Sequence, residues 1–185
     1  AVADSGNDRI QTFSLDGTHL NTWGGFGTGP GQFDDPIHVE FLDDNTLVVG
    51  DKNNWRFQFF SSTGVFLLEF NSNIANEPVK MEASRFSIDD NGEILARYGA
   101  LRSVRRFDRD GEVLADWRSS FGTEPGRFQF SEDLAIDSQG MIYVTDLGNS
   151  RVQKFTPDGQ FLREWGGNGT TPGKFNHLFS IAVRK

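Results

Sequence analysis

The sequence predicts an all-β fold, a β-propeller built from four blades of four antiparallel strands. The first observation is the stretch Asp133–Trp165, which reads as four short strands separated by three turns. Leu134–Asp137 and Met141–Thr145 are apolar runs, Arg151–Phe155 alternates apolar and polar residues, and turn residues separate each strand from the next. Alternation of period two between regularly spaced turns is typical of an antiparallel meander.

The second observation is that this stretch recurs along the chain. The phenylalanines that end the third strand are 47, 47 and 48 residues apart. Two further sets of residues are spaced by the same intervals. The three sets are Phe13, Phe60, Phe107 and Phe155; the turn glycines Gly17, Gly64, Gly111 and Gly159; and Trp23, Phe70, Trp117 and Trp165, which end the fourth strand. Such a period with four strands per unit indicates a β-propeller. One sheet cannot bury both faces alone, so neighbouring units must stack and share a core.

Taken in order, the chain begins with strands two to four of the first blade and ends with a strand-one sequence. The blades are expected at 1–23 together with 178–185, at 37–70, at 81–117 and at 133–165. We therefore expect the C-terminal strand, Leu178–Val183, to pair with the N-terminal strands and close the ring within a single domain of residues 1–185. Closure would cover a sheet edge that otherwise invites aggregation.

Composition excludes several classes of function. The chain has 185 residues, a net charge of −8 and a pI near 4.8, which argues against duplex nucleic acid, whose binding needs clustered cations. It has no cysteine, which excludes disulfides and thiolate sites, and no apolar run long enough to span a membrane. The chain begins inside a strand without a signal peptide or initiator Met, so we expect a mature fragment or an excised domain. The compartment stays open, with a lean towards a secreted or periplasmic protein.

An Asp and an Arg recur at fixed positions of the second and third strands. Blades one, two and four carry Asp4 with Arg9, Asp51 with Arg56, and Asp146 with Arg151. Blade three has Tyr98 and Ser103 at these positions, so both partners are missing from the same repeat. This joint loss predicts that the two side chains touch, as a carboxylate–guanidinium bridge between neighbouring strands.

Four strings of the chain carry a family resemblance: ADSGNDRIQTFSLDGTHLNTWG, GTGPGQFDDP, TDLGNSRVQKFTPDGQFLREWG and GTTPGKFNH. They resemble the NHL-repeat family of β-propellers, strongly in blades one and four, fairly in blade two and mainly by register in blade three. Members usually carry six blades, whereas four are expected here. The resemblance implies a scaffold for binding proteins, RNA or small ligands. A few relatives are enzymes, such as metal-dependent lyases that act on amidated peptides, so function must be argued from the site.

The channel along the propeller axis is the expected place for a site, because the innermost strand of each blade lines it. In the four first strands, apolar residues that should point between blades alternate with residues that should face the axis. The aligned axial positions form a ring of His38, Arg85, Asp133 and Ser180 and a second ring of Glu40, Ser87, Ala135 and Ala182. The polar ring either plugs the channel as a self-satisfied network with bridging water or binds a small molecule or ion.

A metal ion is one alternative at this ring. His38, Glu40 and Asp133 could ligate it, because imidazole and carboxylate groups suit zinc or calcium. Arg85 would repel a cation at the same place and favours an anion or internal ion pairs instead. We therefore expect no cofactor, and a channel-bound metal ion is kept as the alternative.

Blade three also carries a cluster of arginines in a chain that is otherwise acidic. Arg97 and Arg102 belong to it, and Arg102 replaces the loop residue of the repeat on the face that carries the glycine-rich linkers. These side chains either form salt bridges with neighbouring acids or make a basic patch for an acidic partner, carboxylate or phosphate.

The function that these patterns favour is a non-enzymatic binding scaffold that uses the linker face and the channel mouth. The candidate ligand-binding residues are His38, Glu40, Arg85, Arg97, Arg102, Asp133 and Ser180. The expected partner is a protein or a small polar or anionic ligand. The alternative is a metal-dependent lyase or hydrolase with a channel-mouth site, although the sequence contains neither a GxSxG nor an HExxH motif. The oligomeric state stays open.

Overall fold

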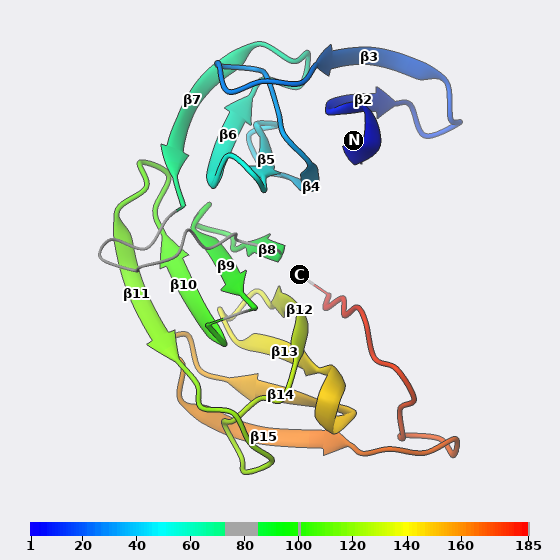
Figure 1. The fold of residues 1–185 in the computed structure, drawn as a ribbon, viewed down its shortest axis with the longest axis vertical. Coiled ribbons are helices and arrows are strands. Elements are labelled where there is room, and N and C mark those ends of the chain that lie inside the picture. The colour runs from blue at the N-terminus through cyan, green and yellow to red at the C-terminus, as the bar shows by residue number, and fades with distance from the viewer. Residues whose placement is uncertain (73–84, 100, 185) are drawn as a thin grey trace. The chain divides into compact units, whose positions relative to one another are not determined.

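The computed structural model describes residues 1–72, 85–99 and 101–184. These residues form four antiparallel β-sheets whose strands follow one another in chain order, as in the blades of a propeller (Figure 1). The predicted all-β propeller fold is confirmed. The chain divides into two compact units, Ala1–Ser84 and Arg85–Lys185. The expectation of a single domain over residues 1–185 stays a prediction.

The N-terminal unit holds blades one and two. Blade one is a three-stranded sheet in the order β1-β2-β3, and blade two is a four-stranded sheet in the order β4-β5-β6-β7. The bounds are β1 (Val2–Asp4), η1 (Ser5–Asn7, a 3-10 helix), β2 (Arg9–Phe13), β3 (His19–Gly24), β4 (Pro36–Phe41), β5 (Leu47–Asp51), β6 (Arg56–Phe60) and β7 (Phe66–Asn71). β1 packs beside β4, which joins the two blades.

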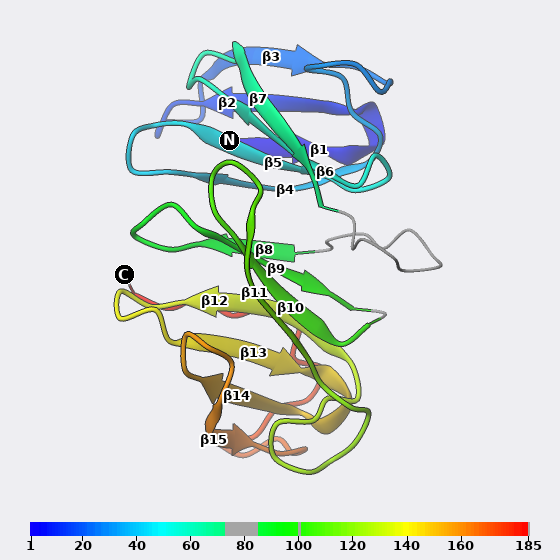
Figure 2. The same ribbon diagram turned by 90° about the vertical axis from the view of Figure 1, so that its left-hand side faces the viewer.

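The C-terminal unit holds blades three and four, in the orders β8-β9-β10-β11 and β12-β13-β14-β15. The bounds are β8 (Arg85–Ile88), β9 (Ile94–Tyr98), β10 (Ser103–Phe107), β11 (Val113–Arg118), β12 (Ser131–Ile136), β13 (Ile142–Asp146), η2 (Leu147–Asn149, a 3-10 helix), β14 (Arg151–Phe155) and β15 (Phe161–Gly166). The first strands of these blades, β8 and β12, lie side by side (Figures 1 and 2). Residues 81–84 and 100 of the expected third blade lie outside the described residues. The expected bounds of the blades stay predictions.

The C-terminal segment differs from the expectation. Residues 178–184 form no strand, and the described sheet of blade one therefore has three strands. Instead, the Ser180 hydroxyl and the Ile181 backbone N–H both donate to the Asp133 carboxylate of β12. One of these bonds occupies a backbone N–H that a strand would offer to its neighbour. The predicted closure of the ring by Leu178–Val183 stays a prediction.

Glycine turns join the third and fourth strands of each blade. In blade four the Thr156 N–H donates to the Gln160 carbonyl at 2.9 Å, and the Gly159 N–H donates to the Thr156 carbonyl at 3.0 Å. Gly159 has a φ of +83° and the equivalent Gly17 one of +87°. Only glycine adopts this backbone conformation without strain, which is why the turn glycine recurs in every repeat.

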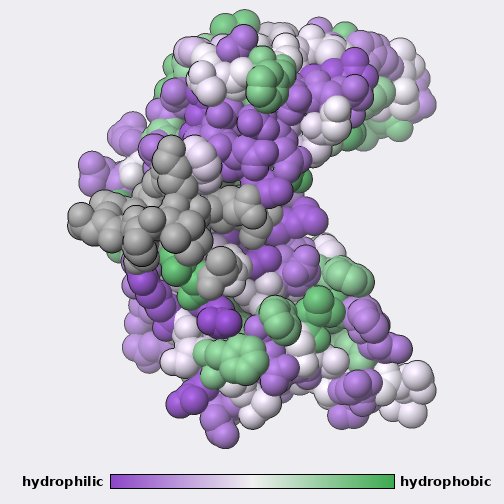
Figure 3. All heavy atoms as spheres, in the orientation of Figure 1, coloured by the Kyte–Doolittle hydropathy of each residue, from purple (hydrophilic) through white to green (hydrophobic). Residues whose placement is uncertain are grey.

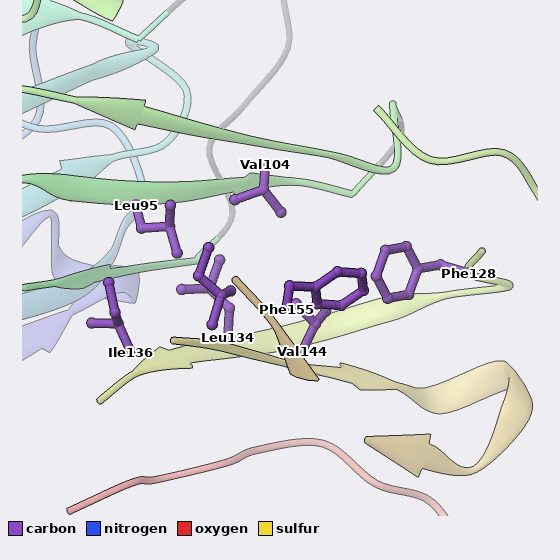
Figure 4. Close-up of a cluster of buried hydrophobic side chains, with 8 residues drawn as sticks. Leu95, Val104, Phe128, Leu134, Ile136, Val144 and Phe155 are labelled. Carbon is purple, nitrogen blue, oxygen red and sulfur yellow. The ribbon is translucent and has the colours of Figure 1, made fainter. Parts of the chain in front are cut away.

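The apolar core of each unit lies between its two blades. In the C-terminal unit, eight buried residues join both sheets: Leu95, Val104, Phe128, Leu134, Ile136, Ile142, Val144 and Phe155 (Figure 4). Leu134 and Ile136 are 3% and 1% exposed, which confirms that these first-strand positions point between blades. Phe128 comes from the linker between the two blades, and Phe33 is its counterpart in the N-terminal core. These two linkers thus each contribute one phenylalanine that helps to seal neighbouring blades.

The described helices are single 3-10 turns, and none of them has the length and hydropathy needed to cross a membrane. On the face of the molecule drawn in Figure 3, hydrophilic side chains predominate, and apolar ones are scattered among them. The linkers carry several exposed phenylalanines, of which Phe26, Phe121 and Phe130 are more than half exposed.

Candidate functional site

The predicted Asp–Arg bridges are present, and in blades two and four they form the centre of a buried clamp. Arg151 Nε donates to the Asp146 carboxylate at 3.0 Å, and the two side chains are 8% and 0% exposed. The other Arg151 donors bond to the Glu164 carboxylate and to the carbonyls of Thr123, Glu124 and Arg127 in the linker. Arg56 repeats this arrangement with Asp51, Glu69 and the carbonyls of Thr28, Gly29 and Gln32. All five donors of each arginine are used, two on carboxylates of the same blade and three on linker carbonyls, so the clamp is structural.

The bridge in blade one is more exposed. Arg9 Nε lies 2.6 Å from Asp4 Oδ2, but the two side chains are 41% and 23% exposed. The hydrogen bond from Arg9, together with one from Asn7, lowers the pKa of Asp4. The pair thus links β1 to β2 without the burial seen in blades two and four.

Blade three replaces the clamp with different chemistry. Tyr98 and Ser103 face each other as Cα partners on β9 and β10, and they are 0% and 1% exposed. Arg105 stands where blade four has Gln153, and its Nη2 donates to the Asp116 carboxylate at 2.5 Å. The loss of the Asp–Arg pair is therefore accompanied by a new ion pair on the neighbouring strand, which explains part of the arginine cluster as internal structure.

The structure brings Asp133 and Ser180, two residues of the predicted axial ring, into contact. Asp133 is 8% exposed. Its Oδ2 accepts hydrogen bonds from the Ser180 hydroxyl at 2.7 Å and from the Ile181 N–H at 3.1 Å. Its Oδ1 accepts one from the Leu134 N–H at 3.0 Å. The Asp133 carboxylate is thus held by donors on both oxygens.

Arg97 lies close to this carboxylate in the same unit, and Arg85 lies beside Arg97. They are Cα partners on β8 and β9. Arg97 is 6% exposed, and its Nε donates to the Glu132 carbonyl at 3.1 Å. Burial lowers the pKa of Arg97 and the charge of Arg85 adds to this effect, whereas the carboxylates of Glu132 and Asp133 act in the opposite direction. Four of the candidate residues therefore gather in one charged cluster, which we call the axial cluster: Arg85, Arg97, Asp133 and Ser180, with Glu132 added by the structure.

His38 and Glu40 lie on β4 of the N-terminal unit, both partly buried. They are two residues apart on one strand, so their side chains share a face of the sheet. Their assembly with the axial cluster into one ring, and any metal held there, stay predictions. Among the described residues, no three His, Asp or Glu side chains are grouped as metal ligands would be.

The linker face of the C-terminal unit carries a feature that the sequence reasoning missed. The Arg102 guanidinium lies 5.1 Å from the centre of the Phe121 ring, and Phe121 and Phe130 are 54% and 62% exposed. Phe121 occupies the same linker position as Phe26, which lies two repeats earlier in the chain. That recurrence was the available signal, because an exposed aromatic at a fixed linker position is not needed for the core.

Comparison with known proteins places these features in context. The NHL repeat profile matches residues 128–155. Peptidylglycine alpha-amidating monooxygenase of Rattus norvegicus is 28% identical over 152 residues, which cover 77% of this chain and 14% of that protein. Protein brain tumor of Drosophila melanogaster is 26% identical over 146 residues, which cover 78% of this chain and 14% of that protein. The chain thus spans about one seventh of these curated relatives.

A solved structure shares the fold over almost the whole chain. The crystal structure of a protein of unknown function from Bacteroides caccae matches 99% of this chain and 60% of that chain, with a TM-score of 0.67 and 17% identity. At that identity the likeness concerns the fold alone, so the site must be interpreted from the residues of this chain.

Proposed function

Because this chain is an NHL-repeat β-propeller, we propose that it is a non-enzymatic binding module whose linker face and channel mouth contact a protein partner or a small polar or anionic ligand. A rigid scaffold of sheets that presents variable loops is well suited to binding. The candidate contacts are those predicted from the sequence: His38, Glu40, Arg85, Arg97, Arg102, Asp133 and Ser180.

The proposal rests on the exposure of Arg85 in the axial cluster and on its lack of a partner among the described residues. Arg85 is exposed, and it forms no ion pair or side-chain hydrogen bond with the described residues. It lies beside Arg97, whose buried charge is held by Glu132 and Asp133. An exposed guanidinium next to a second one is an electrostatically suitable place for an acceptor group of a ligand.

A thermal-shift titration with small anions (acetate, citrate and phosphate) tests the ligand half of the proposal. Anions that bind the native protein raise Tm by mass action. We expect this rise in the wild type and its loss in Arg85→Leu, with the same loss in His38→Leu if the ring is assembled as predicted. Arg163→Leu is the matched control, because Arg163 lies on the outer strand β15 over Trp165. Equal shifts in all variants would mean that the anions act through general screening.

The alternative function is a metal-dependent lyase or hydrolase. The similarity to the rat protein supports an enzyme in general, because that protein is named a monooxygenase of peptidylglycine, whereas the lyase or hydrolase class comes from the family resemblance. Its candidate ligands would be His38, Glu40 and Asp133. Elemental analysis of the purified protein separates the two proposals, because a stoichiometric transition metal that is lost in His38→Leu would favour the enzyme. A protein without bound metal that still binds a partner would favour the binding module.

A further inference from the structure

The described residues contain three copies of the same linker, and the copies differ in their side chains. Each copy follows strand four of a blade and is closed by one parallel bridge between two of its residues: Phe26 with Phe33, Phe121 with Phe128, and Asn168 with Phe175. In each copy the first linker residues also bond to the loop between strands two and three of the preceding blade, as in Gly25 to Asp8, Ser119 to Arg102 and Gly167 to Ser150. The copies therefore serve as internal controls for one another.

Three positions in this shared backbone face solvent and vary. The first is the loop residue in the left-handed conformation, with φ between +50° and +53°: Asp8, Arg102 or Ser150. The second begins the bridge: Phe26, Phe121 or Asn168. The third precedes the phenylalanine that ends the bridge: Gln32, Arg127 or Lys174. The middle copy alone combines two arginines with a phenylalanine.

These three residues are close together in the structure, and we call them the arginine–phenylalanine patch: Arg102, Phe121 and Arg127. The Arg102 guanidinium stacks over the Phe121 ring at 5.1 Å. The Arg127 side chain packs over Gly122, the residue after Phe121, where an added Cβ would lie 2.9 Å from Arg127 Cδ. One cation therefore lies over the exposed ring, and a second contacts the next residue of the chain.

The fold does not use the side chains of these arginines. In the other linkers three of the four equivalent side chains form hydrogen bonds: Asp8 accepts from the Asp35 N–H, Gln32 from the Gly29 N–H, and Lys174 donates to the Gly166 carbonyl. Arg102 and Arg127 form no side-chain hydrogen bond or ion pair with the described residues. Arg127 contributes to the clamp only through its backbone carbonyl, which Gln32 supplies equally well in blade two.

We propose that this patch docks an acidic segment of a partner protein, with carboxylates paired to Arg102 and Arg127 and an apolar side chain against Phe121. Arginine pairs with carboxylates in a bidentate geometry, and arginine and exposed aromatics are common anchors of interfaces. The linker has one acid, Glu124, which is exposed and pairs with neither arginine. The net charge of −8 does not oppose this docking, because screening at physiological salt leaves charges beyond about 8 Å with little effect.

The proposal deepens the binding function and rests on it. Its test measures fluorescence anisotropy of a short fluorescein-labelled peptide of Glu and Phe residues against the wild type and a triple variant. The variant, Arg102→Ser, Arg127→Gln and Phe121→Asn, takes each residue from another copy of the linker, so the backbone should be kept and the melting curve unchanged. The control carries Phe26→Asn and Gln32→Ala in the first linker.

We expect the triple variant to bind about tenfold more weakly than the wild type, since two partly exposed ion pairs are removed, and the control to bind like the wild type. A matching peptide with Gln in place of Glu should bind about tenfold more weakly to the wild type.

The inference is overturned if the triple variant binds like the wild type, or if single-stranded RNA binds the patch more tightly than the acidic peptide. Binding that is lost only in Arg85→Leu overturns the patch but keeps the binding module, whereas a wild type that binds none of the peptides, the RNA or the anions contradicts both.

Discussion

The Ser180 hydroxyl donates a hydrogen bond to the Asp133 carboxylate at 2.7 Å, although the two residues are 47 positions apart. Both residues occupy the same aligned position of a first-strand sequence. The bond is reinforced by the Ile181 N–H, which donates to the same carboxylate oxygen at 3.1 Å. The C-terminal segment is thereby tied to the first strand of blade four.

Removal of this acceptor should release the C-terminal segment. In Asp133→Ala, the Ser180 hydroxyl and the Ile181 N–H lose their partner, and the free energy of unfolding should fall by about 1–3 kcal/mol. Hydrogen exchange of the amides in 178–184 should become faster. Ser180→Ala removes only one of the two bonds and should have the smaller effect. Unchanged exchange in Asp133→Ala would mean that the segment is held by other contacts.

The buried clamp of blade four should show strong coupling between its two charges. Asp146→Ala strands the Arg151 charge in a site where that side chain is 8% exposed, and such a loss costs about 3–5 kcal/mol of unfolding free energy. The double change to Ala should cost much less than the sum of the two single changes. Denaturant unfolding of the four proteins in this double-mutant cycle measures the coupling. The same cycle on Asp4 and Arg9 should give a much smaller coupling, because that pair is exposed.

The turn glycine of blade four should be sensitive to any added side chain. Gly159 has a φ of +83°, and a Cβ there would lie 2.7 Å from the Trp117 ring of the preceding blade. Gly173 has a φ of +82° with open space around it. Gly173→Ala should therefore cost only the backbone strain, about 1 kcal/mol, while Gly159→Ala should cost clearly more because the Trp117 ring must move. Equal losses in Tm would show that the Trp117 contact adds nothing.

The carboxyl of Asp137 should make stability depend on pH. Burial raises the pKa of Asp137, but hydrogen bonds from the Tyr143 hydroxyl and from the N–H groups of Met141 and Gln139 outweigh it, so the pKa is lowered overall. A lowered native pKa contributes stability that is present above the unfolded value near ~4 and is lost as the pH falls through the native value. Tyr143→Phe removes the 2.8 Å hydrogen bond and should lower the unfolding free energy by about 1–2 kcal/mol at neutral pH.

The diagnostic result for this variant is its pH dependence. The variant raises the native pKa of Asp137 towards the ordinary value. The difference in unfolding free energy between the wild type and Tyr143→Phe should therefore become smaller as the pH falls below ~4. Denaturant unfolding across this pH range measures this difference. A difference that does not change with pH would mean that the variant loses stability through packing of the Tyr143 ring and not through its hydrogen bond to the Asp137 carboxylate.

Much of the fold could be predicted because its determinants are local and repeated. The steps of 47 and 48 residues predicted four repeated sheets, since a positive-φ turn needs Gly159 and its equivalents wherever the turn recurs. The Asp–Arg contact could be predicted from the joint loss of both residues in blade three, and it is present in the other three blades. A strand was expected over Leu178–Val183 because the sequence there matches a first strand. It was not found, since the Ile181 N–H bonds to the Asp133 side chain and not to a neighbouring strand.

The sequence by itself determined the repeated antiparallel sheets, the turn glycines, the apolar first-strand residues Leu134 and Ile136 and the charged pairs of strands two and three, because each depends on spacing along a single repeat. Only the tertiary structure decided which polar side chains meet. The contact of Ser180 with Asp133, the stacking of Arg102 on Phe121 and the packing of Arg127 on Gly122 depend on the path of the linkers and on the side-chain conformations at their ends. The linker path and these side-chain conformations are set by packing between residues far apart in the chain. A pattern of period two along one strand does not specify such packing.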